Sequence, residues 1–207
     1  MIVHDTEQGS EAWFAIRAGK PTASNFKKLI TSTGETSKTM SEYAITLAGE
    51  LYAGKPLDAW EGNAYTERGK LLEDEARKMY AFLHDVEPVK VGFVTDDSML
   101  YGCSPDSFVG DDGMLEIKCL KAENHIKAIL YYRKHKKCQP DYVQQTQGQL
   151  MVCERQWCDL FFYHPDLPRL TIRQEPDNEI KYSLRANIVT VLEERDKILV
   201  EIKEVMK

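Results

Sequence analysis

The chain has 207 residues, which is enough for one full domain with its own hydrophobic core. It is 43% hydrophobic and 29% charged, a composition typical of globular proteins that excludes collagen-like, low-complexity and membrane-spanning chains. The net charge of −6, taken alone, argues against a partner as acidic as DNA. Neither a linker rich in Pro, Gly or Ser nor an internal repeat divides the sequence, so we expect a single domain over residues 1–207.

The cysteines and the N-terminal residues indicate in which cellular compartment the protein is expected. The five cysteines are odd in number and form no C-x-x-C pair, which argues against a disulfide framework and favours a reducing compartment. The opening sequence MIVHDTEQGSEAW has neither the basic nor the apolar region of a secretory signal. No apolar run approaches the ~18 residues of a membrane-spanning helix. We therefore expect a cytoplasmic protein with no membrane partner.

The first half of the chain is predicted to be mainly helical. Residues 9–18 form a short helix with Ser10 as its N-cap. The helical spacing places Trp13 and Arg17 on one face of it.

A second short helix is predicted after Pro21, in TASNFKKLI, with Thr22 or Ser24 available as its cap. Residues 31–39 are polar and turn-forming, which indicates an exposed loop. Residues 40–53 return to helical spacing and predict a third helix.

The segment TERGKLLEDEARKMYAFL, residues 66–83, is also predicted to be a helix, because its apolar residues follow the 3.6 period. Glu73 lies at the flank of this apolar stripe instead of opposite it. The stripe consists of Leu72, Ala76, Met79, Tyr80 and Leu83.

Short strands are predicted from about residue 89 to residue 119, in VKVGFVT, MLYGCS, DSFVG and MLEIKCL. The DDG sequence before the last of these indicates a hairpin. The remaining elements are helices over 121–137 and 140–152, strands over 157–164 and 169–174, and a helix over 183–207. This order predicts a mixed α/β fold with helices packed against a central sheet.

The residues that carry chemistry lie at Pro105-Asp106 and at Glu116-Ile117-Lys118. Alternation along the last strand places Glu116 and Lys118 on one face and apolar neighbours on the other. A charged pair on such a strand is costly unless it is paired or binds a ligand. The predicted hairpin brings Asp106 close to Glu116. Two converging carboxylates suit Mg²⁺, and Lys118 could orient or help to deprotonate a metal-bound water.

This spacing resembles the PD-(D/E)xK nuclease motif, although the isolated motif is equally compatible with a turn-capping Asp and a surface Glu–Lys pair. Over nearly its whole length, the chain resembles the phage lambda exonuclease family, also described as YqaJ-type viral recombinases. Five blocks carry the resemblance: QGSEAWFAIRAGKPTASNF, RGKLLEDEAR, YGCSPDSFV, LEIKC and YVQQTQGQLMV. The resemblance implies a restriction-endonuclease-like core, in which helices flank a central mixed sheet.

The resemblance also implies a metal site. Asp106 and Glu116 would ligate one or two Mg²⁺ ions, for which Mn²⁺ could substitute, and the backbone carbonyl of Ile117 would be a further ligand. Lys118 and Gln145 would position the attacking water.

Two of the implied roles rest on the resemblance alone. Glu73 would hold metal-bound water, although its sequence context is that of an ordinary solvated helix residue. Gln145 belongs to a helix with glutamines at 144, 145, 147 and 149, which by itself indicates a solvated face.

A pocket for a 5′-terminal phosphate is implied at Arg17, Ser24 and Ser104. Arginine binds phosphate oxygens through paired hydrogen bonds, and hydroxyls add neutral ones. The residues alone are also consistent with a surface ion pair at Arg17 and a helix cap at Ser24. Trp13 either stacks on the terminal base or sugar or packs in the core. Lys38, in the loop after the second helix, would contact or part the duplex, although this loop is less basic than the family's version.

The function implied by the resemblance is a Mg²⁺-dependent 5′-to-3′ exonuclease. It would digest one strand of linear double-stranded DNA from a 5′-phosphorylated end, release 5′-mononucleotides and leave 3′ overhangs for strand annealing. A homotrimeric ring, a single-strand annealing partner and, if the protein is phage-encoded, the host cytoplasm are implied as well. Two alternatives stay open: an endonuclease of restriction or structure-specific type, and a catalytically silent DNA-binding recombination scaffold.

The net charge is unevenly distributed along the chain. Residues 58–116 contain 14 acidic and five basic residues, including the expected metal carboxylates. Residues 118–137 contain seven basic and one acidic residue, and residues 17–38 contain five basic and one acidic residue. The basic segments flank the expected catalytic strand and phosphate pocket. The distribution therefore fits a DNA path lined with positive charge, although the net charge is negative.

Overall fold

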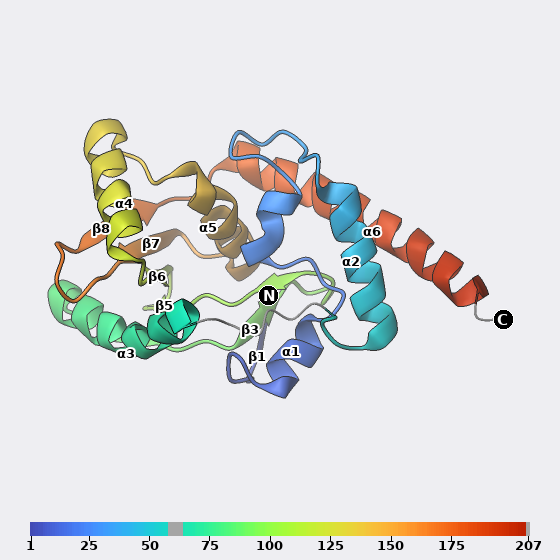
Figure 1. The fold of residues 1–207 in the computed structure, drawn as a ribbon, viewed down its shortest axis with the longest axis horizontal. Coiled ribbons are helices and arrows are strands. Elements are labelled where there is room, and N and C mark those ends of the chain that lie inside the picture. Colours follow the sequence, from blue (N-terminus) through green and yellow to red (C-terminus); the bar gives the residue numbers. More distant parts are fainter. Residues whose placement is uncertain (58–63, 206–207) are drawn as a thin grey trace.

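The computed structural model describes residues 1–57 and 64–205, without the side chains of residues 64–71. The first elements are β1 (Ile2–His4), α1 (Glu11–Arg17), the 3-10 helix η1 (Ala23–Lys28), α2 (Met40–Ala53), α3 (Ala64–His84), β2 (Pro88–Val89), β3 (Phe93–Thr95) and β4 (Gly102–Cys103). The following elements are β5 (Ser107–Val109), β6 (Gly113–Lys118), α4 (Ala122–His135), α5 (Pro140–Cys153), β7 (Trp157–Phe162), β8 (Leu170–Gln174) and α6 (Asn178–Val205). Figure 1 shows their arrangement.

The strands form a larger sheet, in the order β2-β5-β6-β7-β8, and a smaller sheet, in the order β1-β3-β4. Strands β6 and β7 run parallel, while the other neighbouring strands run antiparallel. A parallel pair requires a crossover connection, and helices α4 and α5 supply it between β6 and β7. The larger sheet is therefore mixed.

Side-chain alternation gives the larger sheet two apolar faces. Leu115 and Phe161 on one face pack against Tyr80 of α3. Leu160 and Phe162 on the opposite face pack against residues of α4 and α5. In Figure 1, α3 lies on one side of these strands, and α4 and α5 lie on the other. The residues of β6 that alternate with Leu115 therefore face α5.

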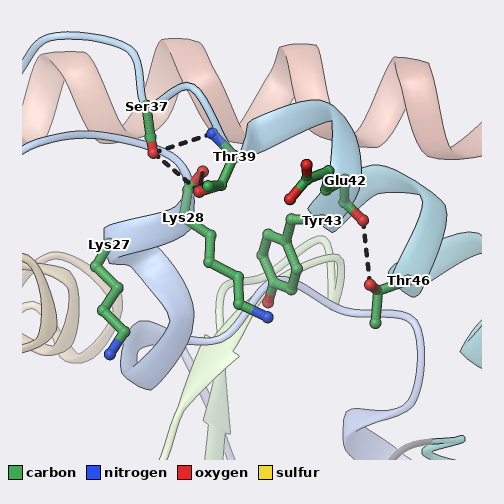
Figure 2. A pocket seen from close by; sticks show the side chains of 7 residues that line it. All are labelled: Lys27, Lys28, Ser37, Thr39, Glu42, Tyr43 and Thr46. Atoms are coloured by element: carbon green, nitrogen blue, oxygen red, sulfur yellow. Dashed lines mark hydrogen bonds between the residues drawn. The ribbon is translucent and has the colours of Figure 1, made fainter.

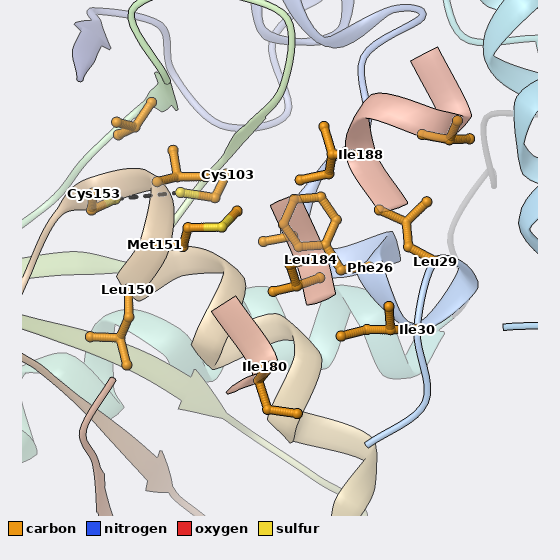
Figure 3. Packing of buried hydrophobic residues seen from close by; sticks show 14 of the residues in the cluster. Phe26, Leu29, Ile30, Cys103, Leu150, Met151, Cys153, Ile180, Leu184 and Ile188 are labelled. Carbon is orange, nitrogen blue, oxygen red and sulfur yellow. Dashed lines mark hydrogen bonds between the residues drawn. The ribbon is translucent and has the colours of Figure 1, made fainter. Parts of the chain in front are cut away.

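A further apolar cluster joins η1, α2, α5 and α6 (Figure 3). Phe26 of η1 and Leu29, which directly follows η1, belong to this cluster together with Met151 of α5 and Leu184 of α6. Gly148 of α5 permits a close approach, because a Cβ atom at this position would stand 2.3 Å from the Phe26 ring. Close packing at Gly148 thus fixes α5 relative to η1.

The mixed α/β fold predicted from the sequence, with helices flanking a central mixed sheet, is confirmed. Ser10 caps α1 by accepting a hydrogen bond from the Trp13 backbone N–H (3.2 Å), and α2 has the predicted bounds. The short helix after Pro21 is a 3-10 helix, and the side chain of its N-cap, Thr22, makes no capping bond. The terminal helix starts earlier than predicted, at Asn178.

Three other predictions differ from the structure. Strand β1, which pairs with β3, was not predicted. The strand predicted over residues 89–95 is divided between the two sheets. Gly92 lies at the division, where a Cβ atom would stand 2.4 Å from the Thr6 carbonyl oxygen, so the N-terminal segment crosses the chain there. Leu83, predicted as the last residue of the apolar stripe of α3, is 48% exposed. The buried part of the stripe therefore ends before the last turn of the helix.

The cysteines are all free thiols. Cys103 and Cys153 lie in the core with their Sγ atoms 3.4 Å apart (Figure 3). Among the helices that the structure describes, none has both the length and the apolar character needed to cross a bilayer.

Replacing Gly148 with Ala is expected to lower the free energy of unfolding by about 1–3 kcal/mol, because the added methyl group overpacks the contact with Phe26. This loss should exceed the gain of at most about 1 kcal/mol from the better helix propensity of Ala. Chemical denaturation would measure the change. The double variant Gly148→Ala/Phe26→Leu should recover part of it, and unchanged stability of the single variant would contradict the packing argument.

Candidate active site

The β5–β6 hairpin brings the predicted carboxylates together. Asp106 immediately precedes β5, and the strand register pairs Ser107 with Leu115. The Asp106 Oδ2 atom accepts a hydrogen bond from the backbone N–H of Ile117 at 2.5 Å. The Asp106 side chain thus reaches across the hairpin to the strand that carries Glu116, as the spacing predicted.

Glu116 is the centre of the site and is only 4% exposed. Its Oε1 atom accepts hydrogen bonds from Lys118 Nζ and Gln145 Nε2, both at 2.6 Å. Its Oε2 atom accepts one from Gln149 Nε2 at 2.6 Å. Gln145 and Gln149 lie one helical turn apart on α5, so both amides face β6. These donors offset the cost of burying the charge. We call Asp106 and these four residues the carboxylate cluster.

Lys118 is held within the carboxylate cluster from several sides. Besides Glu116, its Nζ atom donates to Gln145 Oε1 at 3.1 Å and lies 5.6 Å from the centroid of the Tyr142 ring. Burial disfavours the ammonium form, but the carboxylates of Glu116 and Asp106 outweigh this effect and raise the pKa of Lys118. Lys118 therefore acts here as a fixed positive charge and a hydrogen-bond donor.

At Asp106, burial and the neighbouring negative charges both disfavour the charged form of the side chain. Burial, followed by the charges of Glu116 and Glu73, raises the pKa of Asp106 well above its usual range. Glu73 and Asp106 both line a cavity of about 660 Å³ between the N-terminal loop and α3. The structure thus brings Glu73, Asp106 and Glu116 near one another, as the resemblance implied.

Arg77 links α3 to this region and was missed by the sequence reasoning. It is 7% exposed and donates to Glu73 Oε1 and Asp74 Oδ1, each at 2.5 Å. It also donates to Ser107 Oγ at 2.9 Å and to the Asp106 backbone carbonyl at 3.4 Å. Its position four residues after Glu73 was the only signal in the sequence.

The donor set of the carboxylate cluster fits a divalent cation. The neighbouring negative charges that raise the pKa of Asp106 would be offset by such an ion. Within the described residues, no three His, Cys, Asp or Glu side chains form a complete ligand cage. Mg²⁺ does not require one, because it keeps several waters and takes one or two carboxylates. Asp106, Glu116 and the Ile117 carbonyl are the groups that could hold it.

A second group of side chains gathers around Trp13. The guanidinium carbon of Arg17 lies 3.7 Å from the centroid of the Trp13 ring, and Trp13 Nε1 donates to Ser104 Oγ at 2.9 Å. These three residues line a cavity of about 230 Å³ together with Ser24 and members of the carboxylate cluster, including Asp106. Trp13 therefore orients two groups of the expected phosphate pocket.

Arg17 supplies the positive charge of this cavity. Burial lowers the pKa of its guanidinium to about 10, so it remains a cation at neutral pH. Within the described part of the chain, neither a hydrogen bond nor an ion pair engages the guanidinium. A half-buried arginine with available donors beside a cavity is suited to bind an anion such as phosphate.

Two predicted residues are less firmly held. Ser24 is exposed; its Oγ atom lies 3.4 Å from Thr22 Oγ1, and it lines the cavity without capping η1. Lys38 is also exposed, but it lines neither this cavity nor the cavity that shares Arg17 and Ser24 with it. The structure therefore brings together the predicted site residues except Lys38.

A family model described as the YqaJ-like viral recombinase domain matches residues 12–156, more than half of the chain and the part that carries both clusters of side chains. The chain belongs to this family. The resemblance predicted from the five sequence blocks is thus confirmed. No curated protein sequence matches the YqaJ-family chain.

Solved structures resemble this YqaJ-family protein over almost its whole length. The alkaline exonuclease LHK-Exo from Laribacter hongkongensis is 31% identical, covers 95% of this chain and 98% of its own, and has a TM-score of 0.83. Its complex with dAMP gives 30% identity, the same coverage and a TM-score of 0.82. A phage related exonuclease from Haemophilus somnus 129PT shares the fold at 17% identity, with a TM-score of 0.71 and coverage of 88% and 96%. The fold is therefore that of lambda-type exonucleases.

Replacing Asp106 with Asn is expected to raise the melting temperature of the metal-free protein at neutral pH. The raised pKa means that the native state loses stability as pH rises from the unfolded-state pKa of about 4 through the folded value, and Asn removes that loss. A gain of about 1 kcal/mol corresponds to a few degrees in a domain of this size. Calorimetry in EDTA would measure it.

The gain should fade near pH 4, where Asp106 is protonated in the native state. Asp112→Asn, which removes the same charge from an exposed turn, is the matched control. A destabilised Asp106→Asn protein at neutral pH would show that the carboxylate is stabilised, not strained, by its surroundings.

Proposed function

We propose that this YqaJ-family protein is a Mg²⁺-dependent exonuclease that digests one strand of linear double-stranded DNA, 5′ to 3′, from a 5′-phosphorylated end. It would release 5′-mononucleotides and leave 3′ overhangs for recombination by strand annealing. One observation carries the proposal: a single cavity of about 230 Å³ joins Arg17 and Ser24 to Asp106 and Glu116. A terminal phosphate at Arg17 and a scissile phosphate at the carboxylates would bound one nucleotide.

Asp106, Glu116 and the Ile117 carbonyl would hold one or two Mg²⁺ ions, with Mn²⁺ as a substitute. When bound, the metal would polarise the scissile phosphate and make the attacking water more acidic. Lys118, kept protonated by its neighbours, would stabilise negative charge that develops on the phosphate. Gln145, which already bonds Lys118 and Glu116, would help Lys118 to orient the water, and Glu73 would hold further water.

Arg17, with Ser104 and Ser24, would select the end of the strand. Paired hydrogen bonds from the guanidinium would hold the terminal phosphate, and Trp13 would keep Arg17 and Ser104 in place through the contacts described above. After each hydrolysis, the new 5′-phosphate could enter the same pocket. The dAMP complex of LHK-Exo supports a site of nucleotide size in this family.

The partners would be double-stranded DNA ends, two further copies of the chain in a trimeric ring, and a single-strand annealing protein, in the cytoplasm. The basic segments 17–38 and 118–137 would supply positive charge along the DNA path. The first segment contains Arg17 and Ser24 of the phosphate pocket and the second begins at Lys118 of the carboxylate cluster, which supports DNA contact next to the proposed site.

The purified protein with Mg²⁺ is expected to digest linear 5′-phosphorylated duplex to 5′-mononucleotides and to leave closed circular duplex intact. Asp106→Asn should lower the rate more than about a hundredfold, since even outer partners of metal ligands cost up to about that much. Mg²⁺ should raise the melting temperature of the wild type but not of Asp106→Asn. Cleavage of closed circles would indicate an endonuclease, and DNA binding without cleavage a silent scaffold.

Replacing Arg17 with Ala is expected to slow digestion of 5′-phosphorylated ends by about tenfold to a hundredfold, the loss of one or two charged hydrogen bonds. Digestion of 5′-hydroxyl ends should change little, because the missing phosphate makes no such bonds. Initial rates on the two ends give the comparison. Arg185→Ala, at an exposed position on α6, is the control, and equal slowing of both ends by Arg17→Ala would remove the pocket assignment.

A further inference from the structure

The cavity that joins Arg17 to the carboxylates adjoins a second cavity, and the second adjoins a third. A second cavity, of about 640 Å³, shares Arg17 and Ser24 with the first but contains neither Asp106 nor Glu116. A third cavity, of about 500 Å³, shares Lys28, Tyr43 and Thr46 with the second. We call this third cavity the η1–α2 groove. Its polar lining includes Lys27, Lys28, Ser37, Thr39, Tyr43 and Thr46 (Figure 2).

The shared residues set the order of the cavities: the carboxylates first, then Arg17, then the η1–α2 groove. In the proposed reaction, the scissile phosphate lies at the carboxylates and the next phosphate on the 5′ side lies at Arg17. Any nucleotides still further in the 5′ direction must continue past Arg17, away from Asp106 and Glu116. The η1–α2 groove lies in that direction, and its volume is within the range of ligand-sized clefts.

The walls of the groove are suited to a nucleic-acid backbone. Lys27 and Lys28 of η1 both line it, and Lys28 extends alongside Tyr43 (Figure 2). In the described residues neither lysine is in an ion pair. The hydroxyl groups of Ser37, Thr39 and Thr46 also line the groove, and Glu42 is the single acidic residue of the lining. Phosphate groups are bound in this way, by cations together with neutral donors.

The groove is also firmly built. Tyr43 is 4% exposed, and its hydroxyl accepts a hydrogen bond from the Thr22 backbone N–H at 3.2 Å, so the ring cannot swing away. Lys28 Nζ lies 4.9 Å from the centroid of this ring. The loop that carries Ser37 is anchored by its backbone N–H to the Leu29 carbonyl at 2.8 Å.

We propose that the η1–α2 groove binds the sugar-phosphate backbone of a single-stranded 5′ extension, so that the protein accepts 5′-tailed duplex ends as well as flush ends. The proposal rests on the proposed function, because the position of a terminal phosphate at Arg17 defines the 5′ direction.

Hydrolysis of a tailed end at the carboxylates would release the tail and the first paired nucleotide as one oligonucleotide. The water oxygen joins phosphorus, the bond from phosphorus to the 3′-oxygen breaks, and that oxygen takes a proton. The oligonucleotide leaves with a 3′-hydroxyl, and the shortened strand keeps a 5′-phosphate.

The test compares binding of two duplexes by the full chain in EDTA, where no cleavage occurs. One duplex has flush 5′-phosphorylated ends, and the other carries a short oligo(dT) 5′ tail. Wild type should bind the tailed duplex more tightly, with a salt dependence steeper by about 0.7 for each tail phosphate contacted. Lys27→Glu should weaken tailed binding about fivefold or more, as for loss of an exposed charge contact, and should weaken flush binding clearly less. Lys203→Glu, an equal charge change at an exposed position of α6, should alter neither.

Equal affinity and equal salt dependence for the two duplexes would overturn the proposal. Equal weakening of both duplexes by Lys27→Glu would also overturn it, because the groove would then belong to the path of the duplex. Digestion of the flush duplex in Mg²⁺ tests the proposed function separately. Flush digestion without tail binding would reject only the groove assignment, whereas tail binding without digestion would reject only the nuclease.

Discussion

The buried carboxylate of Glu116 is the interaction on which the rest of the site depends. A charge removed from water costs several kcal/mol unless donors replace its hydration. Lys118 beside it and Gln145 and Gln149 across from it supply those donors. Since two of the three come from α5, Glu116 can be buried only when α5 lies across this face of the sheet. Gly148, on the same helix, then brings η1 against α5. A single charged group thus connects the central sheet to the elements that form the phosphate pocket.

Asp106 shows what this arrangement costs. Its carboxyl group is buried and held near two other carboxylates, so the ionised form that suits metal binding is disfavoured in the protein alone. Arg77 limits the cost by binding Glu73 and the Asp106 backbone from α3. Without a bound cation, this arrangement of carboxylates therefore lowers the stability of the folded protein. This is the trade-off expected where function requires like charges in proximity.

Patterns of short range were readable in the sequence, and contacts of long range were not. The two-residue period of a strand predicted that Glu116 and Lys118 share a face, and the helical period predicted α2. Strand β1 has only three residues and is defined by its distant partner β3. The division of residues 89–95 depends on the backbone of the N-terminal segment near Gly92. Arg77 remained hidden for the same reason, because its role depends on Ser107 and Asp106, about thirty residues along the chain.

In the proposed reaction, the contact between Gly148 and Phe26 fixes the distance between the two phosphate-binding sites. The groups for the terminal phosphate lie mainly on α1 and η1, while the groups for the scissile phosphate lie just before β5 and on β6, beneath α5. The separation of these two sets is the thickness of a close-packed layer, and close-packed interiors yield little to compression. The packing of the hydrophobic core would then determine how many nucleotides are removed from a flush end in each turnover. Residues that never touch the substrate would define the size of the product.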